Sequence, residues 1–266
     1  MMRALWSAAS GMTSQQLNVD VISNNLANVN TTGYKKERVE FKDMLYETMD
    51  RAYVLDNKGK PVNLQVGHGV TPVATVKNYA TGNFEKTDNP LDLAIDGEGF
   101  FKVRGPQGDV VYARDGSFKV SVTDEGKKLT TSDGYSVLDQ DDEEIFIEGE
   151  ISKFQVSGSG EISFVDDAGE IQSTGQSIGL VKFENRFGLE SIGNNFYRSN
   201  GAVGESIPDG ETGVRSVISQ GFLEASNVQV VEEMVKLIVA QRAYEVNSKA
   251  IQSADEMLGQ ANNLKR

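Results

Sequence analysis

The prolines and glycines of this 266-residue chain are almost confined to its middle. All five prolines and 24 of the 27 glycines lie between residues 46 and 221, and the two ends hold only Gly11, Gly33 and Gly259. Because proline and glycine interrupt helices and are typical of turns, long helices can form only at the two ends. The middle should fold from short elements joined by turns.

The N-terminal end has a heptad pattern, in which apolar residues follow at alternating steps of three and four. A helix over residues ~3–28 would be about 40 Å long at 1.5 Å per residue. It should end in the Asn-rich stretch 24–30, before a turn at Gly33 that glycine adopts at little cost. The predicted seam consists of Leu5, Ala8, Met12, Gln15, Val19, Ile22, Leu26 and Val29.

The C-terminal end predicts a second helix of the same kind. Ser226 and Gln229 have the spacing of a capping box, which indicates an N-cap at Ser226 and a helix that runs to about residue 262. Its predicted seam consists of Val230, Met234, Leu237, Tyr244, Ile251 and Leu258, with Gln241, Ser248 and Asp255 at the intervening positions. A second apolar stripe at Val231, Val235 and Ile238 widens the apolar face of the first turns.

The middle of the chain is typical of antiparallel β structure, either a sandwich or a barrel. Short apolar runs alternate there with turn pairs at Asp96-Gly97, Asp115-Gly116 and Asp133-Gly134. The predicted strands cover 100–103, 110–113, 118–120, 135–138, 145–147, 162–165 and 180–183.

These patterns together predict an α+β fold with three parts. Residues 1–33 and 226–266 should form a terminal helical domain, in which the two helices pair as a coiled-coil stalk. Residues 34–80 should be an extended connecting segment and residues 81–225 a β domain. Within the connecting segment, Glu47–Val66 is weakly patterned, so it is either a flexible linker or an arm that orders against neighbouring molecules.

Composition excludes several classes of function. The chain carries 39 acidic and 26 basic side chains, a net charge of −13, which disfavours binding to nucleic acid. It has no cysteine, and therefore no disulfide or thiolate metal site. No stretch approaches the ~20 apolar residues of a membrane span, and we expect no cleaved signal peptide.

Candidate catalytic groups are few, and each has a simpler interpretation. His68, the only histidine, lies between two glycines without the context of a catalytic triad, so we interpret it as a loop residue. The acidic run at 139–144 lacks the spacing of a calcium loop and is typical of a solvated turn. The glycines of 95–100 lead into a strand, which favours a hairpin turn over a phosphate cradle. We predict no enzyme activity, cofactor or metal.

Paired terminal helices would leave part of the C-terminal helix's apolar surface uncovered. Such a surface favours contacts with further copies of the chain. Contacts between different faces of identical subunits do not close, and they generate helical filaments.

The two ends and several motifs between them resemble the flagellar basal-body rod and hook proteins. The most specific part is Asn24-Asn25-Leu26-Ala27-Asn28 followed by Thr32-Gly33-Tyr34-Lys35. Further similar segments are 5–12, 82–84, 89–101, 114–118, 132–135, 221–228, 232–234 and 241–245. Length and residues 41–48 are most similar to the distal rod subunits of that family.

This resemblance implies a subunit that is exported by the flagellar type III apparatus and polymerises into the distal rod, a periplasmic drive shaft. It implies partners among neighbouring rod and hook proteins and the rings around the rod, with the terminal helices lining the tube. The expected subunit interface combines Leu5, Met12, Val19, Ile22, Leu26 and Val29 with Val230, Met234, Leu237, Tyr244, Ile251 and Leu258. Alternatives are a proximal rod or hook-type subunit, or a β-rich cell-wall binding module with a dimerising stalk.

Overall fold

The computed structural model describes residues 2–50, 52–55, 58–60, 63–105, 107–124, 126–147, 150–165, 171–210 and 215–263. The chain divides into two compact units. Unit 1 comprises Met1–Ala27, Glu37–Lys77 and Gln229–Arg266, and unit 2 comprises Asn28–Lys36 and Asn78–Val228.

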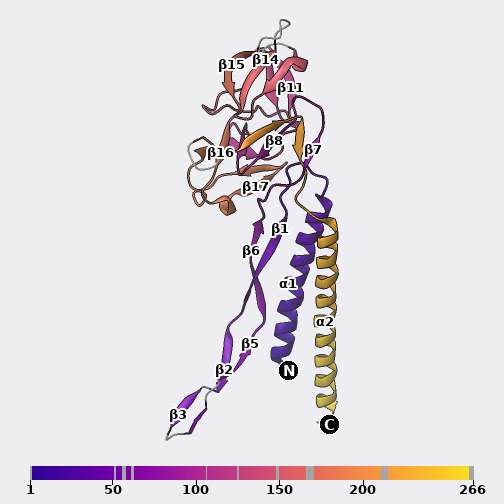
Figure 1. Cartoon of the computed structure of the whole chain (residues 1–266). Helices are drawn as coiled ribbons and strands as arrows, with labels where there is room; N and C mark the ends of the chain where they lie inside the picture. The colour runs from indigo at the N-terminus through magenta and orange to yellow at the C-terminus, as the bar shows by residue number, and fades with distance from the viewer. Residues whose placement is uncertain are drawn as a thin grey trace. The chain divides into compact units, whose positions relative to one another are not determined.

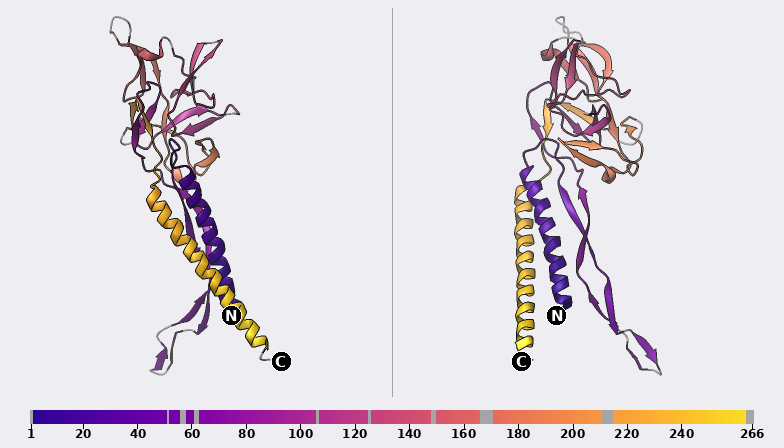
Figure 2. Two further views of the ribbon diagram at one scale, coloured as in Figure 1. Left: turned by 90° about the vertical axis from the view of Figure 1, so that its right-hand side faces the viewer. Right: turned by 180° about the vertical axis from the view of Figure 1, so that it is seen from behind.

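Unit 1 contains both predicted helices, α1 (Met2–Ala27) and α2 (Val230–Asn263). They contact each other and run in opposite directions, as Figures 1 and 2 show. The predicted N-cap of α2 was wrong by three residues, because the first intrahelical bond runs from the Glu233 amide to the Gln229 carbonyl at 3.0 Å. The Ser226 hydroxyl instead accepts a bond from the Val228 amide at 3.3 Å, within the preceding turn.

The rest of unit 1 is a narrow two-stranded ribbon, visible beside α1 in Figure 1. Its antiparallel pairs are β1 (Glu37–Asp43) with β6 (Val70–Lys77), β2 (Tyr46–Asp50) with β5 (Leu64–Gly67), and β3 (Tyr53–Leu55) with β4 (Lys58–Lys60). Residues 47–66, considered above as a linker or an arm, therefore include hydrogen-bonded strands. Their apolar pattern is weak because β2, which begins the range, is largely exposed on both faces.

Unit 2 consists of small antiparallel sheets, so the predicted α+β class with an antiparallel centre is confirmed. Its largest sheet has the order β17 (Glu190–Gly193), β18 (Phe196–Arg198), β10 (Val110–Ala113), β9 (Phe100–Arg104), β16 (Leu180–Lys182), β19 (Ile207–Pro208). A second sheet contains β13 (Phe154–Val156), β14 (Glu161–Val165) and β15 (Ile171–Ser177). The pairs are β11 (Lys119–Thr123) with β12 (Gly126–Thr130), β8 (Leu93–Asp96) with β20 (Val217–Gln220), and β7 (Phe84–Lys86) with β21 (Phe222–Glu224). Two short 3₁₀ helices, at Ile151–Lys153 and Arg186–Gly188, complete it.

Two details of the β prediction were wrong. Residues 135–138 and 145–147 are not continuous strands; they form isolated bridges such as Val103 with Val137 and Lys128 with Phe146. The turn at Asp96-Gly97 does not close a hairpin, since β8 pairs with β20 whereas β9 pairs with β10 and β16. A local turn signal cannot specify which distant strand provides the partner.

The core of unit 2 explains why these short elements hold together. One apolar cluster lies under β8, β9 and β14, and fully buried Phe101 and Phe118 pack edge to face in it at 5.1 Å between ring centroids. A second cluster groups aromatic rings around Phe100, including Phe183 and Tyr197 at 5.7 Å each. Burial of these rings together with the aliphatic side chains of both clusters supplies the apolar contribution to the stability of the unit.

Gly116 of the predicted turn pair Asp115-Gly116 has a packing role that can be tested. A Cβ atom at this position would lie 1.7 Å from the carbonyl oxygen of Leu93, so the backbone would have to move. We expect Gly116→Ala to lower the free energy of unfolding by about 3 kcal/mol, measured by urea denaturation. Gly201→Ala is the control, because a Cβ there meets nothing within 4 Å and should change little. Equal effects would contradict this packing.

Candidate assembly surfaces

Asn25, in the most specific of the similar motifs, joins three elements of unit 1. Its Oδ1 accepts from the Glu37 amide at 2.9 Å, and its Nδ2 donates to the Glu37 carbonyl at 2.8 Å. Nδ2 also donates to the carboxylate of Glu233 at 3.2 Å. A single buried amide thereby fixes the end of α1 to the start of β1 and to the first turn of α2.

The intervening positions of the α2 contact seam differ from the predicted ones. Buried positions on α2 are Glu233, Ala240 and Ala254. A Cβ on Gly11 of α1 would lie 2.7 Å from the Nδ2 of Asn247, so the helices approach closely there. The intervening positions are therefore 240, 247 and 254, one residue before the predicted Gln241, Ser248 and Asp255. Ala240 and Ala254 of α2 and Gly11 of α1 allow the close approach.

The residues predicted for a subunit interface have different environments in the isolated chain. Ile22 is buried, and the partly buried ones are Leu5, Met12, Val19, Leu26, Val29, Leu237, Ile251 and Leu258. Val29 lies beyond the end of α1, in unit 2. Val230, Met234 and Tyr244 are exposed, with 40%, 49% and 42% of their surface accessible.

The first half of α2 presents an apolar surface to solvent. Its exposed apolar residues are Val230, Val231, Met234, Val235, Ile238, Val239 and Val246, which we call the outer stripe. At 3.6 residues per turn, Val231, Val235 and Ile238 lie on the helix face opposite Glu233 and Ala240. The residues that contact α1 therefore leave this stripe uncovered within the chain.

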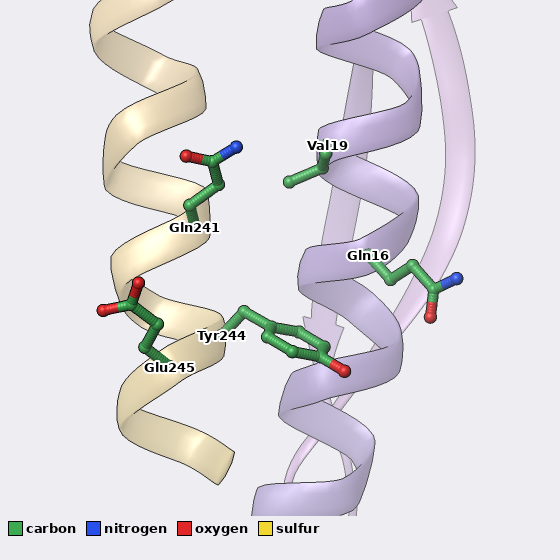
Figure 3. Close-up of a pocket in the computed structure, with 5 residues that line it drawn as sticks. All are labelled: Gln16, Val19, Gln241, Tyr244 and Glu245. Carbon is green, nitrogen blue, oxygen red and sulfur yellow. The ribbon is translucent and has the colours of Figure 1, made fainter. Parts of the chain in front are cut away.

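A hollow of about 380 Å³ opens between the two helices. It is lined by Gln16, Val19, Gln241, Tyr244 and Glu245. In Figure 3 the Tyr244 ring points from α2 toward α1, whereas Gln16 points away from α2. The lining combines Val19 and the Tyr244 ring with polar side chains, which suits a side chain from another molecule better than a small charged ligand.

The ribbon is attached to α1 by polar contacts in unit 1. Arg3 pairs with Glu47 at 2.6 Å, and the Ser10 hydroxyl accepts from the Val70 amide at 3.3 Å. His68 lies in the loop after β5, as predicted, and its Nδ1 is 2.9 Å from the carbonyl oxygen of Leu45. That geometry gives the imidazole a role in joining the two strands of the ribbon.

The acidic run at 139–144 lies in a turn of unit 2 and is paired with basic side chains. Lys102 pairs with Asp142, and Lys128 pairs with Glu144 at 2.6 Å. The hydrogen bond from Lys128 holds the pKa of the Glu144 carboxyl below its usual value. Among the described residues, no group of acidic or histidine side chains has the arrangement of a metal site.

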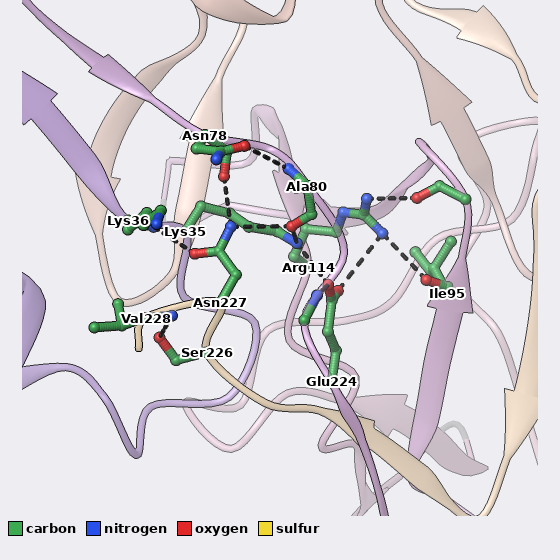
Figure 4. A network of polar contacts seen from close by, with 12 residues as sticks. Lys35, Lys36, Asn78, Ala80, Ile95, Arg114, Glu224, Ser226, Asn227 and Val228 are labelled. Carbon is green, nitrogen blue, oxygen red and sulfur yellow. Dashed lines mark hydrogen bonds and ion pairs between the residues drawn. The ribbon is translucent and has the colours of Figure 1, made fainter. Parts of the chain in front are cut away.

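Unit 2 contains a buried charge cluster that the sequence patterns did not predict (Figure 4). Lys35 Nζ lies 2.5 Å from Glu224 Oε1, with both side chains 1% exposed. Arg114 Nη1 lies 3.6 Å from Glu224 Oε2, and Arg114 also donates to the Gly97 carbonyl at 2.6 Å. All three charged residues come from segments that resemble the rod and hook family. Two buried cations therefore share one buried carboxylate.

This arrangement lowers the pKa of the Lys35 ammonium from 10.5 to about 8, first through burial and then through the charge of Arg114. Below pH 8 Lys35 is protonated in both the folded and the unfolded chain, so the free energy of folding includes the full cost of burying its charge. Between about pH 8 and 10.5 the unfolded chain binds more protons, so stability should rise with pH, by roughly 3 kcal/mol in total. Urea unfolding of the native chain and Lys35→Met at several pH values measures this. An unchanged pH slope in the variant would contradict it.

No helix within the described ranges is both long and apolar enough to cross a membrane.

Three family models match the chain. They are described as flagella basal body rod protein, over residues 5–35, flagellar hook protein FlgE/F/G D1 domain, over 94–164, and flagellar basal body rod FlgEFG protein C-terminal, over 219–264. The first covers nearly all of α1, and the third covers all of α2.

Similar proteins extend over the whole chain. The flagellar basal-body rod protein FlgG of Borreliella burgdorferi is 47% identical, with 100% of both chains covered. The proteins of the same name from Caulobacter vibrioides and Bacillus subtilis are 43% and 39% identical, with 97% and 100% of each chain covered.

Proposed function

The chain belongs to the family of the flagellar basal-body rod protein FlgG, and from this premise we propose how it assembles and carries load. The family consists of structural subunits of the flagellar rod. We assign this chain to the distal rod, where its copies would form a drive shaft that transmits torque to the hook without any enzymatic step.

The observation that carries the proposal is the outer stripe of α2. Val231 is 76% exposed and Val239 is 63% exposed, on a helix whose opposite face already contacts α1. An apolar face of this kind is unfavourable in water and favours association with another molecule. In a homopolymer, the stripe of each subunit would be covered by a different face of its neighbour, which makes the assembly open-ended.

The inner pairing of α1 and α2 would act as a coiled-coil stalk within each subunit. The predicted interface residues Leu5, Met12, Val19, Ile22 and Leu26 would pack with Leu237, Ile251 and Leu258 there. The exposed Val230, Met234 and Tyr244 would instead contact neighbouring subunits. The terminal helical domain would thus be 1–33 with 226–266, with 34–80 as a connecting arm and 81–225 as the β domain.

The ribbon provides a second surface for contacts between subunits. Leu45 is 88% exposed, and Met49 and Leu64 are 58% and 52% exposed. A thin ribbon has little core of its own, so its apolar side chains gain most from a neighbouring subunit. We propose that residues 47–66 act as a strut that stiffens the rod.

Membership of the family supports a proposal for the partners and the location. Copies of this chain would contact one another, neighbouring rod and hook proteins, and the rings around the rod. The rod would lie in the periplasm, and its subunits would reach it through the flagellar export apparatus.

Limited proteolysis of the monomer and the polymer tests this function. We expect residues 2–27, 37–66 and 230–263 to be cut quickly in the monomer, because each helix is covered on one face only and the ribbon has little core, and to be protected in the polymer. Sedimentation should show monomers that assemble into long polymers above a threshold concentration. Equal protection in both states, or a discrete oligomer at every concentration, would overturn the proposal.

A further inference from the structure

The polypeptide passes between the two units at four points, after residues 27, 36, 77 and 228. A force that the chain carries from one unit to the other must pass through these four peptide bonds. On the side of unit 2, three segments carry all four crossings, namely 28–36, 78–82 and 224–228. How these segments are held together within unit 2 therefore decides how such a force is shared.

We call 28–36, 78–82 and 224–228 the crossing segments. Asn227, in the third, binds both of the others with its side-chain amide (Figure 4). Its Oδ1 accepts from the Lys36 amide at 2.8 Å, and its Nδ2 donates to the carbonyls of Asn78 at 2.8 Å and Ala80 at 3.0 Å. The Asn78 amide also donates to the Lys36 carbonyl at 2.8 Å. Because these partners are backbone groups, the bonds hold the chain itself.

The buried charge cluster holds the same segments a second time. Lys35 donates to the Ala80 carbonyl at 3.0 Å as well as to Glu224, and Glu224 accepts from the Gly82 amide at 2.8 Å. The Glu224 carbonyl accepts from the Gly33 amide at 2.8 Å. Every crossing segment is thus joined to both others.

Arg114 connects this group to the core of the β unit. It donates to the Gly97 carbonyl at 2.6 Å, and its guanidinium lies 5.3 Å from the centroid of the Phe100 ring, which is fully buried. Apolar side chains of the same volume could fill this space with similar stability, since a buried ion cluster is weak evidence for stability. Directional bonds differ from apolar contacts because they resist sliding of one segment against another.

We propose that Asn227, Lys35 and Glu224, anchored by Arg114, form a crossing clamp that makes the three segments move as one and shares torque among the four crossings. This role rests on the proposed function of the chain as a rod subunit. It adds a specific load-bearing site to that function. The clamp lies entirely within unit 2.

The chain offers a closely matched control. Gln220 also makes three amide bonds to backbone groups, donating to the carbonyls of Pro90 at 2.7 Å and Phe154 at 2.9 Å and accepting from the Val156 amide at 3.2 Å. Its partners lie inside the β unit and carry no crossing. Asn227→Ala and Gln220→Ala therefore remove the same number of hydrogen bonds. The bonds lost in Asn227→Ala join the crossing segments, whereas those lost in Gln220→Ala join strands and loops inside the β unit.

The test compares these variants in the full chain. Hydrogen exchange in the monomer should be roughly tenfold faster at the Lys36 amide in Asn227→Ala, and at the Val156 amide in Gln220→Ala. Rods assembled from each variant are then twisted with an attached bead. We expect a loss of torsional stiffness for Asn227→Ala only.

Equal stiffness of the two variant rods would overturn the clamp. Failure of the native chain to form rods would instead overturn the proposed function. If either alanine variant does not fold, Asn227→Gln and Gln220→Asn replace them, because each keeps an amide and moves it by one methylene. The same difference in stiffness is then expected, and its absence would again overturn the clamp.

Discussion

Replacing Glu224 by alanine should unfold unit 2 more readily than any exposed substitution in it, with a loss of about 4 kcal/mol. The carboxylate is the shared partner of Lys35 and Arg114, and all three side chains are 1% exposed. Its removal leaves two buried cations without their carboxylate and the Gly82 amide without its acceptor. Urea unfolding at pH 7, followed by near-ultraviolet circular dichroism, measures the loss.

The matched control is Glu98→Ala, which removes an ion pair with Arg186 in the same unit. That pair has a distance of 3.0 Å, but the Glu98 side chain is 65% exposed. Exposed pairs of this kind contribute less than about 1 kcal/mol. If Glu224→Ala cost no more than Glu98→Ala, the cluster would not stabilise unit 2.

The cluster could not be predicted from sequence patterns, although its residues stand in motifs that resemble the family. Lys35, Arg114 and Glu224 are far apart in the chain. Lysine, arginine and glutamate are usually found at protein surfaces, so none of the three residues is expected to be buried. Periodicity identifies elements and their buried faces, but it does not bring distant segments together. The available signal was that each of three motifs that resemble the family contains a charged residue, which suggests a shared site.

The helices were predictable because they combine a strong period with an absence of breakers. The packing of α2 was less predictable. Large apolar residues dominate a heptad pattern, whereas the buried positions of α2 include the small residues Ala240 and Ala254. The buried Glu233 was not considered a seam residue. Its charge is satisfied by Asn25 and Lys236, contacts that no local pattern reveals.

The ribbon shows the opposite difficulty. Residues 47–66 lack a strand pattern because both faces of β2 are largely exposed, so alternation carries no signal. Backbone pairing between β2 and β5 defines these strands instead. Sequence reasoning could therefore locate an arm at this position without identifying its structure.

Replacing Ile238 by aspartate should abolish polymerisation and leave the monomer folded. Ile238 is 56% exposed on the outer stripe, so the change should alter the free energy of unfolding by no more than about 0.5 kcal/mol. In the polymer, the carboxylate would have to be buried against an apolar face without a partner, and this cost recurs in every subunit. Sedimentation and electron microscopy of the polymer, with thermal unfolding of the monomer, measure both effects.

Two control variants separate the apolar contact from charge alone. Ile238→Leu keeps the volume and apolar character, so rods should form as they do with the native chain. Ser253→Asp adds the same charge on the same helix face about four turns further on, beyond the stripe, and should permit assembly. Long polymers from Ile238→Asp would show that the stripe is not an interface. If Ser253→Asp prevented polymerisation as strongly as Ile238→Asp does, the loss would be due to the added charge. An apolar interface at the stripe predicts a loss of polymerisation for Ile238→Asp alone.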